Sequence, residues 1–223
     1  MATVHDLSRW ERDIKRQTEG WQDKLLVNGK GQPRPVEFNI AVILQHHPDF
    51  AGRLRFNEMA EAAECSAMPW KPCESWRAWT DTDDVALAMW CQYQDIMAKP
   101  ATCASAVQMV AAQHPHHPVR EYLDGLRWDG TPRLSTWLVT YLGVKVEPGR
   151  ERYIEQVSRK TMLQPVARIY QPGCKADHLP VLRGAQGLGK SSAIRALAKN
   201  EAWFADEVAD LGSKDSAQDL RGK

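Results

Sequence analysis

Apolar residues recur at helical spacing through most of the first 170 residues, and short polar stretches with glycine or proline separate the apolar runs. Apolar positions three and four residues apart are typical of helices packed on one side. This pattern predicts helices at 39–45, 58–64, 85–97, 102–113, 119–126, 136–142 and 150–168. A single short strand is predicted at Leu54–Asn57. We therefore expect this part of the chain to be mostly α-helical.

Capping signals support several of these helices. Asn39 is placed to cap the first of them, and Ser135 is placed to cap the helix at 136–142. Residues 80–83 (Thr-Asp-Thr-Asp) resemble a capping box. Three apolar residues follow the box at helical spacing: Val85, Met89 and Tyr93. Pro165 is expected to kink or break the longest helix near its end.

Residues 28–35 have the sequence Asn-Gly-Lys-Gly-Gln-Pro-Arg-Pro. Because its glycines and prolines do not allow a helix, this segment is predicted to be a linker. Two interpretations are open for the basic residues Lys24, Lys30 and Arg34 in and near this segment. They either contact a phosphate backbone or belong to a solvated connector, and the connector is favoured.

The pattern changes near residue 179, where an apolar run, a glycine-rich stretch and an amphipathic segment follow one another. The run Leu179 to Leu182 predicts a buried strand, and residues 193–199 predict a helix. Between them, residues 184–191 match the phosphate-binding loop pattern of glycine, four residues and Gly-Lys-Ser. Strand, glycine loop and helix in this order form the setting that such a loop requires. A tight turn that carries Gly-Lys-Ser by chance is the less favoured alternative.

The residue types in this loop suit a bound triphosphate. Gly184, Gly187 and Gly189 remove side chains, so that backbone N–H groups can approach the phosphates. Lys190 is the predicted catalytic residue, with its ammonium against the β- and γ-phosphates, and the Ser191 hydroxyl is a predicted Mg²⁺ ligand. The predicted nucleotide-binding residues are Gly184, Ala185, Gln186, Gly187, Leu188, Gly189, Lys190, Ser191 and Ser192. The predicted cofactors are ATP and Mg²⁺.

A second strand is predicted at 203–206, and it is short. Asp206 at its end is a weak candidate for the second carboxylate that organises Mg²⁺, and a polar helix is predicted from Ser213 onward. No apolar strand that ends in an acidic residue follows. We therefore expect an α/β P-loop NTPase core that is incomplete, with only its opening strand-loop-helix-strand present. Three regions are expected: an extension at 1–36, a helical region at 37–170 and the start of the core at 171–223.

Composition narrows the function classes only slightly. The net charge of +1 gives no overall attraction to nucleic acid, so such binding has to rest on local patches. Five cysteines without a Cys-x-x-Cys pair suit reduced thiols in the cytoplasm, and no signal peptide or membrane-length apolar run occurs. Three histidines at 114–117 lie among prolines, and an interhelix loop is favoured there over a metal site.

Several longer motifs lie at 117–124, 126–134, 166–170, 172–177 and 182–192. Together they resemble the virulence-associated protein E family of phage, prophage and plasmid P-loop ATPases, which are similar to superfamily 3 and primase-helicase motors. The resemblance covers about residues 117–223 and extends more loosely toward residue 25. It implies an ATP- and Mg²⁺-dependent motor that acts on DNA and usually forms a ring. By motif match it also implies that Gly184, Gly187, Gly189, Lys190 and Ser191 contact the nucleotide. Lys175 and Asp177 match the family pattern, and a loop that positions the strand is favoured as their role.

We thus expect the ATP-binding part of a phage, prophage or plasmid DNA replication ATPase, a helicase or primase-helicase motor. DNA, single-stranded or at a fork, is the expected partner, self-association into a ring is expected of the complete protein, and no membrane is involved. The Walker B strand and the arginine finger of the family are not found in this sequence, so the fragment alone is expected to hydrolyse ATP inefficiently. A non-catalytic DNA-binding or subunit-interaction module is the alternative, and a small-molecule P-loop kinase is less favoured.

Overall fold

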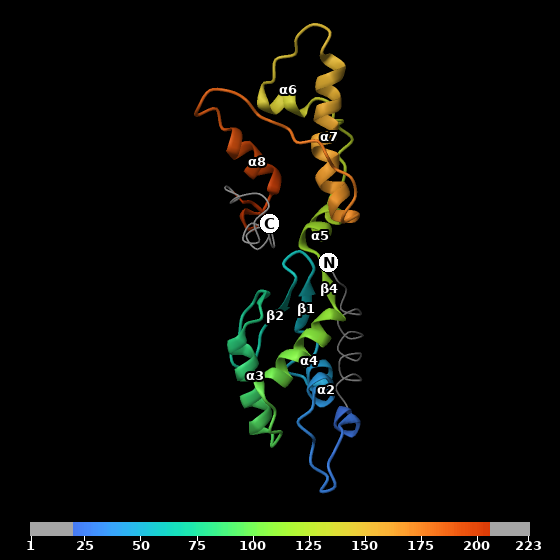
Figure 1. The fold of residues 1–223 in the computed structure, drawn as a ribbon, viewed down its shortest axis with the longest axis vertical. Helices are drawn as coiled ribbons and strands as arrows, with labels where there is room; N and C mark the ends of the chain where they lie inside the picture. Colours follow the sequence, from blue (N-terminus) through green and yellow to red (C-terminus); the bar gives the residue numbers. More distant parts are fainter. Residues whose placement is uncertain (1–19, 206–223) are drawn as a thin grey trace. The chain divides into compact units, whose positions relative to one another are not determined.

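A computed structural model describes residues 20–205 of the 223-residue chain. The fold is mixed α/β, and it divides into two compact units between His116 and His117 (Figure 1). The region boundary expected at 170/171 falls inside the second unit. Of the segments predicted from the sequence, residue Asp206 and the helix from Ser213 lie outside the described residues.

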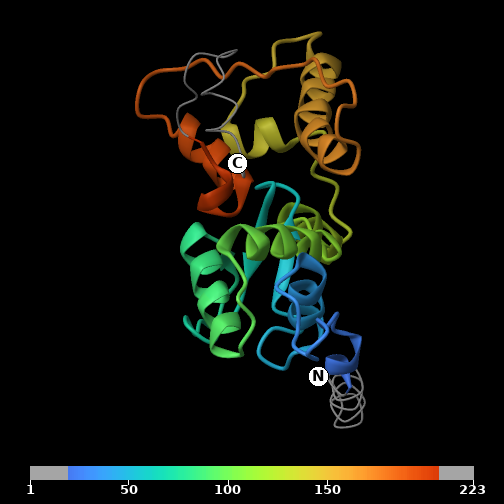
Figure 2. The same ribbon diagram turned by 60° about the horizontal axis from the view of Figure 1, so that its bottom comes forward.

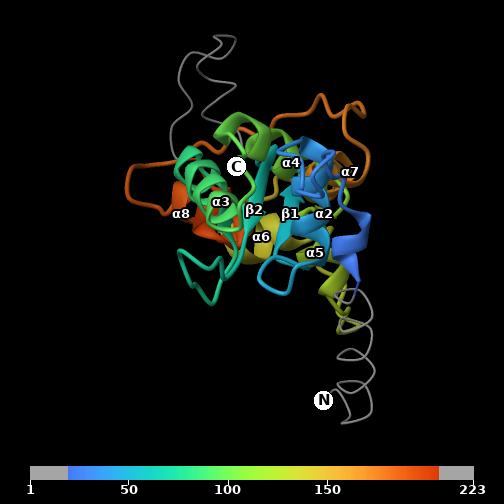
Figure 3. The same ribbon diagram turned by 90° about the horizontal axis from the view of Figure 1, so that it is seen from below.

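The first unit contains a four-stranded sheet with the strand order β3-β2-β1-β4. Strands β1 and β2 lie side by side in it (Figure 1, Figure 3). Its strands are β1 (Leu54–Asn57), β2 (Ala62–Cys65), β3 (Arg77–Ala78) and β4 (Pro115–His116). The β1–β2 and β2–β3 pairs are antiparallel, whereas β4 lies parallel to β1. The strand predicted at Leu54–Asn57 is confirmed. The histidine stretch is not a simple loop, because His116 lies in β4.

The helix predicted at 58–64 is wrong, because this stretch forms the turn and second strand of a hairpin. Ala63 and Cys65 are buried while Glu64 faces the other side of the sheet, which is the two-residue period of a strand. The Arg55 guanidinium lies 2.7 Å from the Glu64 carboxylate across the β1–β2 pair. Contacts between the two strands therefore outweigh the local helical signal.

Three helices complete the first unit: α2 (Glu37–His46), α3 (Asp81–Tyr93) and α4 (Pro100–Ala112). Helix α4 lies beside α2 and α3 and also contacts β1 and β2 (Figure 2). The core between these elements includes Ile40, Ile43, Leu44, Phe50, Leu87, Cys91 and Val107. On α3 the buried face is the one with Leu87 and Cys91, and the stripe of Val85, Met89 and Tyr93 is exposed.

Asn39 is not a helix cap, so that prediction is wrong. Helix α2 begins after Val36, and Asn39 is its third residue and fully buried. The Asn39 amide accepts a hydrogen bond from the backbone N–H of Leu26 and donates to the carbonyls of Leu26 and Arg34, each at 2.8 Å. The side chain therefore holds the non-helical linker against α2, since a buried amide needs such partners.

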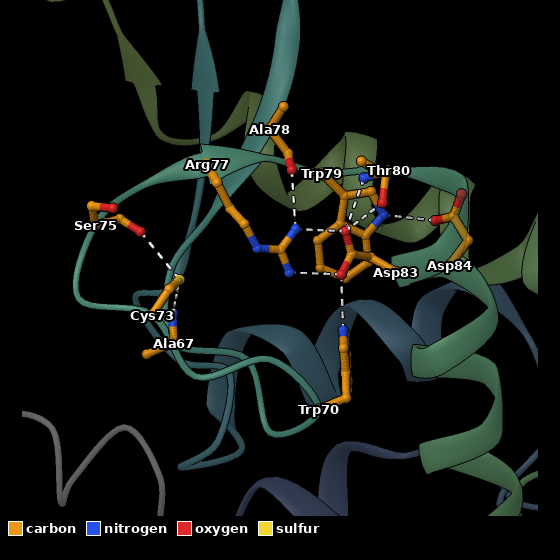
Figure 4. Close-up of polar contacts among 10 residues, drawn as sticks. All are labelled: Ala67, Trp70, Cys73, Ser75, Arg77, Ala78, Trp79, Thr80, Asp83 and Asp84. Atoms are coloured by element: carbon orange, nitrogen blue, oxygen red, sulfur yellow. Dashed lines mark hydrogen bonds and ion pairs between the residues drawn. The ribbon is translucent and has the colours of Figure 1, made fainter.

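A buried carboxylate joins β3, the preceding connector and α3 (Figure 4). Asp83 is 3% exposed and accepts two hydrogen bonds from the Arg77 guanidinium, both at 2.7 Å. The Trp70 indole N–H donates to it at 2.9 Å, and the backbone N–H and hydroxyl of Thr80 donate at 3.0 and 2.8 Å. The predicted capping box is thus confirmed, and its acidic residue also anchors an arginine and a tryptophan.

These contacts set the protonation of the carboxyl group. Burial by itself raises the pKa of Asp83, but the hydrogen bonds from Arg77, Trp70 and Thr80 lower it by more, so the pKa lies well below its usual range. A carboxyl whose pKa is lower in the folded than in the unfolded state stabilises the fold above the unfolded-state pKa of about 3.9. This contribution is lost as the pH falls below that value toward the folded-state pKa.

The second unit contains four helices among its described residues: α5 (Pro118–Gly125), α6 (Trp137–Leu142), α7 (Glu151–Tyr170) and α8 (Lys190–Ala198). Short 3-10 turns, η1 (Trp21–Lys24) and η2 (Glu201–Trp203), occur in the first and second unit respectively. Helices α5 and α6 each contact α7. The N-cap of α6 is Thr136 and not Ser135, so the predicted cap is wrong. Of the kink or break expected at Pro165, the break is wrong, because α7 continues through Pro165 to Tyr170, and the kink stays a prediction.

The strand predicted at Leu179 to Leu182 is also wrong. Leu179 and Val181 are 85% and 82% exposed, and the segment has no regular structure. A strand is stable only when a neighbour pairs with its backbone, and residues 117–205 provide no such partner. The second predicted strand is wrong where it is described, because Trp203 ends the turn η2. Within residues 20–205, no helix combines the length and apolar character that crossing a membrane requires.

Replacing Asp83 by Asn tests the buried network. The variant keeps the size of the side chain but leaves the Arg77 guanidinium without its anion, so we expect the opening free energy of α3 to fall by about 3 kcal/mol at pH 7. Hydrogen exchange of the α3 backbone amides measures this quantity. Asp81→Asn is the matched control, because Asp81 is an exposed acid in the same first turn. Equal losses in the two variants would show that only the helix-end charge matters.

Candidate functional site

The glycine loop predicted to bind phosphate leads directly into a helix. Residues 184–189 are irregular, and α8 begins at Lys190, three residues earlier than predicted. Gly187 and Gly189 have φ angles of +84° and +72°, which L-residues with a side chain rarely adopt. The loop-to-helix arrangement expected from the sequence is therefore confirmed, although the strand before it is not formed.

At Gly184 the space for a side chain is limited by a neighbouring residue, and not by the backbone conformation. Its φ angle is not in the left-handed region, and a Cβ placed there would lie 3.2 Å from Cδ1 of Leu188. Leu188 is 69% exposed, so its side chain has room to move away. The conformation of the loop thus depends on Gly187 and Gly189 more than on Gly184.

Lys190 folds its side chain back over the loop. Its ammonium group donates hydrogen bonds to the carbonyl oxygens of Gly184 at 3.1 Å and Ala185 at 2.7 Å. In the described part of the chain both hydrogen-bond partners of this ammonium are neutral carbonyls. The positive charge is therefore held at the loop, and no carboxylate among residues 20–205 pairs with it.

The beginning of α8 is open to an anion. Gly189 is its N-cap and supplies no capping side chain, and the first turn contains no acidic residue. The first backbone N–H groups of a helix lack partners within the helix and lie at the positive end of its dipole. Ser191 and Ser192 lie in this first turn with exposed side chains. Backbone donors, an ammonium and a hydroxyl thus come together at one helix end, and such a set can hold a phosphate group.

Residues 123–223 match the family model of the virulence-associated protein E-like domain. This segment belongs to that family. The resemblance derived from the sequence motifs is therefore confirmed over these residues. No curated protein matches the chain.

A cavity of about 580 Å³ lies between α8 and α7. It is lined by Ile194, Leu197 and Ala198 on α8, by Arg168 on α7 and by residues 178–180. Ile194 and Leu197 are 38% and 45% exposed. The apolar face of α8 therefore borders a cavity and is only partly covered.

His178 connects α7 to the segment before the loop, and the sequence analysis did not identify it. Its ring nitrogens lie 3.0 Å from the Lys160 ammonium and 2.9 Å from the Gln164 amide. Since Lys160 can only donate, the ring nitrogen facing it accepts and carries no proton. A single histidine without a spacing pattern offers no signal in the sequence for this role.

Two other residues of the family pattern pair with each other. The Lys175 ammonium and the Asp177 carboxylate lie 3.3 Å apart, and both side chains are exposed. Among the residues that the structure describes, no group of three or more His, Cys, Asp or Glu is arranged to hold a metal ion. Asp206 lies outside the described residues. The described part of the domain thus contributes one candidate Mg²⁺ ligand, the Ser191 hydroxyl.

A Gly189→Ala substitution should loosen the start of α8. Because the left-handed backbone at this position disfavours a Cβ, we expect the opening free energy of the helix to fall by about 1–2 kcal/mol. Hydrogen exchange of the amides of Lys190–Ala198 measures the change. Gly184→Ala is the control, since its backbone conformation accepts alanine and only the Leu188 side chain has to move. Equal protection of α8 in the two variants would contradict the role assigned to Gly189.

Proposed function

We propose that this chain is the ATP-binding part of a DNA replication ATPase of a phage, prophage or plasmid, of the helicase or primase-helicase type. The observation that carries the proposal is the loop at 184–189, which ends in two left-handed glycines and delivers Lys190 and Ser191 to an uncapped helix end. Its location in a virulence-associated protein E-like domain supports the same assignment.

The loop residues have distinct roles in this proposal. The phosphates of ATP carry full negative charges, so they attract the Lys190 ammonium more strongly than do the neutral carbonyls of Gly184 and Ala185. Backbone N–H groups at the start of α8 would donate to the phosphate oxygens. The Ser191 hydroxyl would be one oxygen ligand of Mg²⁺. Bound Mg²⁺ would neutralise part of the phosphate charge.

The distribution of charge supports a nucleic-acid partner. Residues 117–223 contain 17 Lys and Arg against 13 Asp and Glu, a net charge of +4. Residues 1–116 contain 12 Lys and Arg against 15 Asp and Glu, a net charge of −3. The overall charge of +1 is therefore the sum of an acidic first unit and a basic second unit, and a basic surface attracts a phosphate backbone.

Replacing Lys190 by Ala tests the nucleotide site. Titration of the 223-residue chain with labelled ATP and Mg²⁺ should show saturable binding, and the substitution should weaken it at least about tenfold, because a charge-assisted hydrogen bond contributes about 1.5–3 kcal/mol. Lys145→Ala is the matched control, since Lys145 is an exposed lysine of the same unit. Absence of saturable binding to the unsubstituted chain would refute the proposal.

A second measurement separates the motor from a binding module. ATP hydrolysis that single-stranded DNA stimulates, and that Lys190→Ala abolishes, is expected of a motor. Binding of DNA or self-association without turnover would favour the non-catalytic module, and phosphate transfer to a metabolite without any effect of DNA would favour a kinase.

A further inference from the structure

An exposed tryptophan lies on a turn of the second unit that the nucleotide site does not use. Trp128 precedes α6, and 79% of its surface is accessible. An exposed aromatic ring offers an apolar face on which another ring can stack. This makes Trp128 a candidate for binding.

Local hydrogen bonds hold the turn in one shape. The Asp129 carboxylate accepts from the backbone N–H of Thr131 at 3.0 Å and from the Arg133 guanidinium at 2.9 and 2.7 Å. Gly130 supplies a φ angle of +83°. The Trp128 indole N–H donates to the Thr131 carbonyl at 3.4 Å. The exposed ring is therefore fixed by its own turn and not by burial.

A groove of about 430 Å³ separates this turn from α7. We call it the tryptophan groove; it is lined mainly by Trp128, Arg133, Trp137, Arg159 and Met162. Trp137 is 5% exposed, and its indole N–H donates to the carbonyl of Ser158 on α7 at 2.9 Å, which fixes the groove wall. The groove thus combines an exposed aromatic face, apolar side chains and two guanidinium groups.

The arginines of the groove remain available to an anion. Arg133 pairs with Asp129 and Arg159 pairs with Glu155, but the side chains of both arginines are about half exposed. Each guanidinium has five N–H donors, so it can contact a phosphate group with the donors that its carboxylate partner leaves over. The net charge of +4 over residues 117–223 favours anions at this unit.

We propose that the tryptophan groove binds single-stranded nucleic acid. An unpaired base stacks on the Trp128 ring, and the adjoining phosphates contact Arg133 and Arg159, because aromatic rings and basic side chains together form the usual single-strand site. Bases inside a duplex are already stacked and offer no free face to the ring. The inference rests on the DNA partner of the proposed function and assigns that partner a place distinct from the glycine loop.

Fluorescence anisotropy of a labelled single-stranded oligonucleotide with the 223-residue chain tests the inference. Trp128→Ala should raise the Kd about tenfold, since loss of one stacked base has effects of this order. Trp128→Phe should recover most of the affinity, because phenylalanine retains a face for stacking. Arg159→Gln should weaken binding and reduce the slope of log K against log salt by about 0.7, as expected for one lost phosphate contact.

Two matched controls lie in the first unit. Tyr93→Ala removes an aromatic ring that is 88% exposed, and Lys99→Gln removes an exposed lysine, so both should leave the Kd within about twofold. Circular dichroism checks that each variant keeps its helix content. An unchanged Kd in Trp128→Ala, equal losses in Tyr93→Ala, equal affinity for a duplex of the same sequence, or no binding by the unsubstituted chain would each overturn the inference.

The result of the oligonucleotide-binding test can be distinguished from the result of the ATP-binding test. Labelled ATP titrates the glycine loop and does not depend on Trp128, whereas oligonucleotide binding without ATP does not depend on Lys190. Loss of oligonucleotide binding in Lys190→Ala, with no effect of Trp128→Ala, would place the nucleic acid at the loop instead of the groove. Intact ATP binding with failed oligonucleotide binding would reject the groove and leave the nucleotide site standing.

Discussion

The turn into α8 depends on two backbone conformations that favour glycine. At Gly187 and Gly189 the φ angle is positive, and with side chains at both positions the chain would not enter the helix at the same angle. The entry angle decides where the Lys190 ammonium lies and whether the first N–H groups of α8 remain open. The position of the positive charge at this loop is therefore a consequence of backbone geometry.

The two units are stabilised in different ways. In the first, helices and sheet enclose a continuous apolar core, and Asp83 is buried at its edge with a full set of donors. In the described part of the second, three residues are buried, Trp137, Leu138 and Ser158, and much of the order comes from local turns and caps. A small core leaves a large share of the basic and aromatic side chains on the surface. This is consistent with a unit whose surface groups bind other molecules.

Features set by neighbouring residues were predictable from the sequence, and those set by distant partners were not. The glycine loop, the capping box at Thr80 and the strand β1 depend on local patterns, and all three are found. Strand β2 was mistaken for a helix because its pairing with β1 is not visible in a seven-residue window. Asn39 resembles a cap by type, yet its partners Leu26 and Arg34 lie outside the helix it was assigned to.

The run from Leu179 to Leu182 is a second case in which a distant partner decides the structure. Its composition is that of a buried strand, but a strand exists only when another backbone accepts its hydrogen bonds, and the described residues of its unit offer none. The glycine loop needs no such partner, because its φ angles and the Lys190 contacts are local. The turn at Trp128 is local in the same sense, since Asp129, Thr131 and Arg133 all lie within five residues of the ring. Groups that their own turns hold in place lose little conformational freedom on binding. The glycine loop and the turn at Trp128 therefore keep their geometry without contacts from distant parts of the chain.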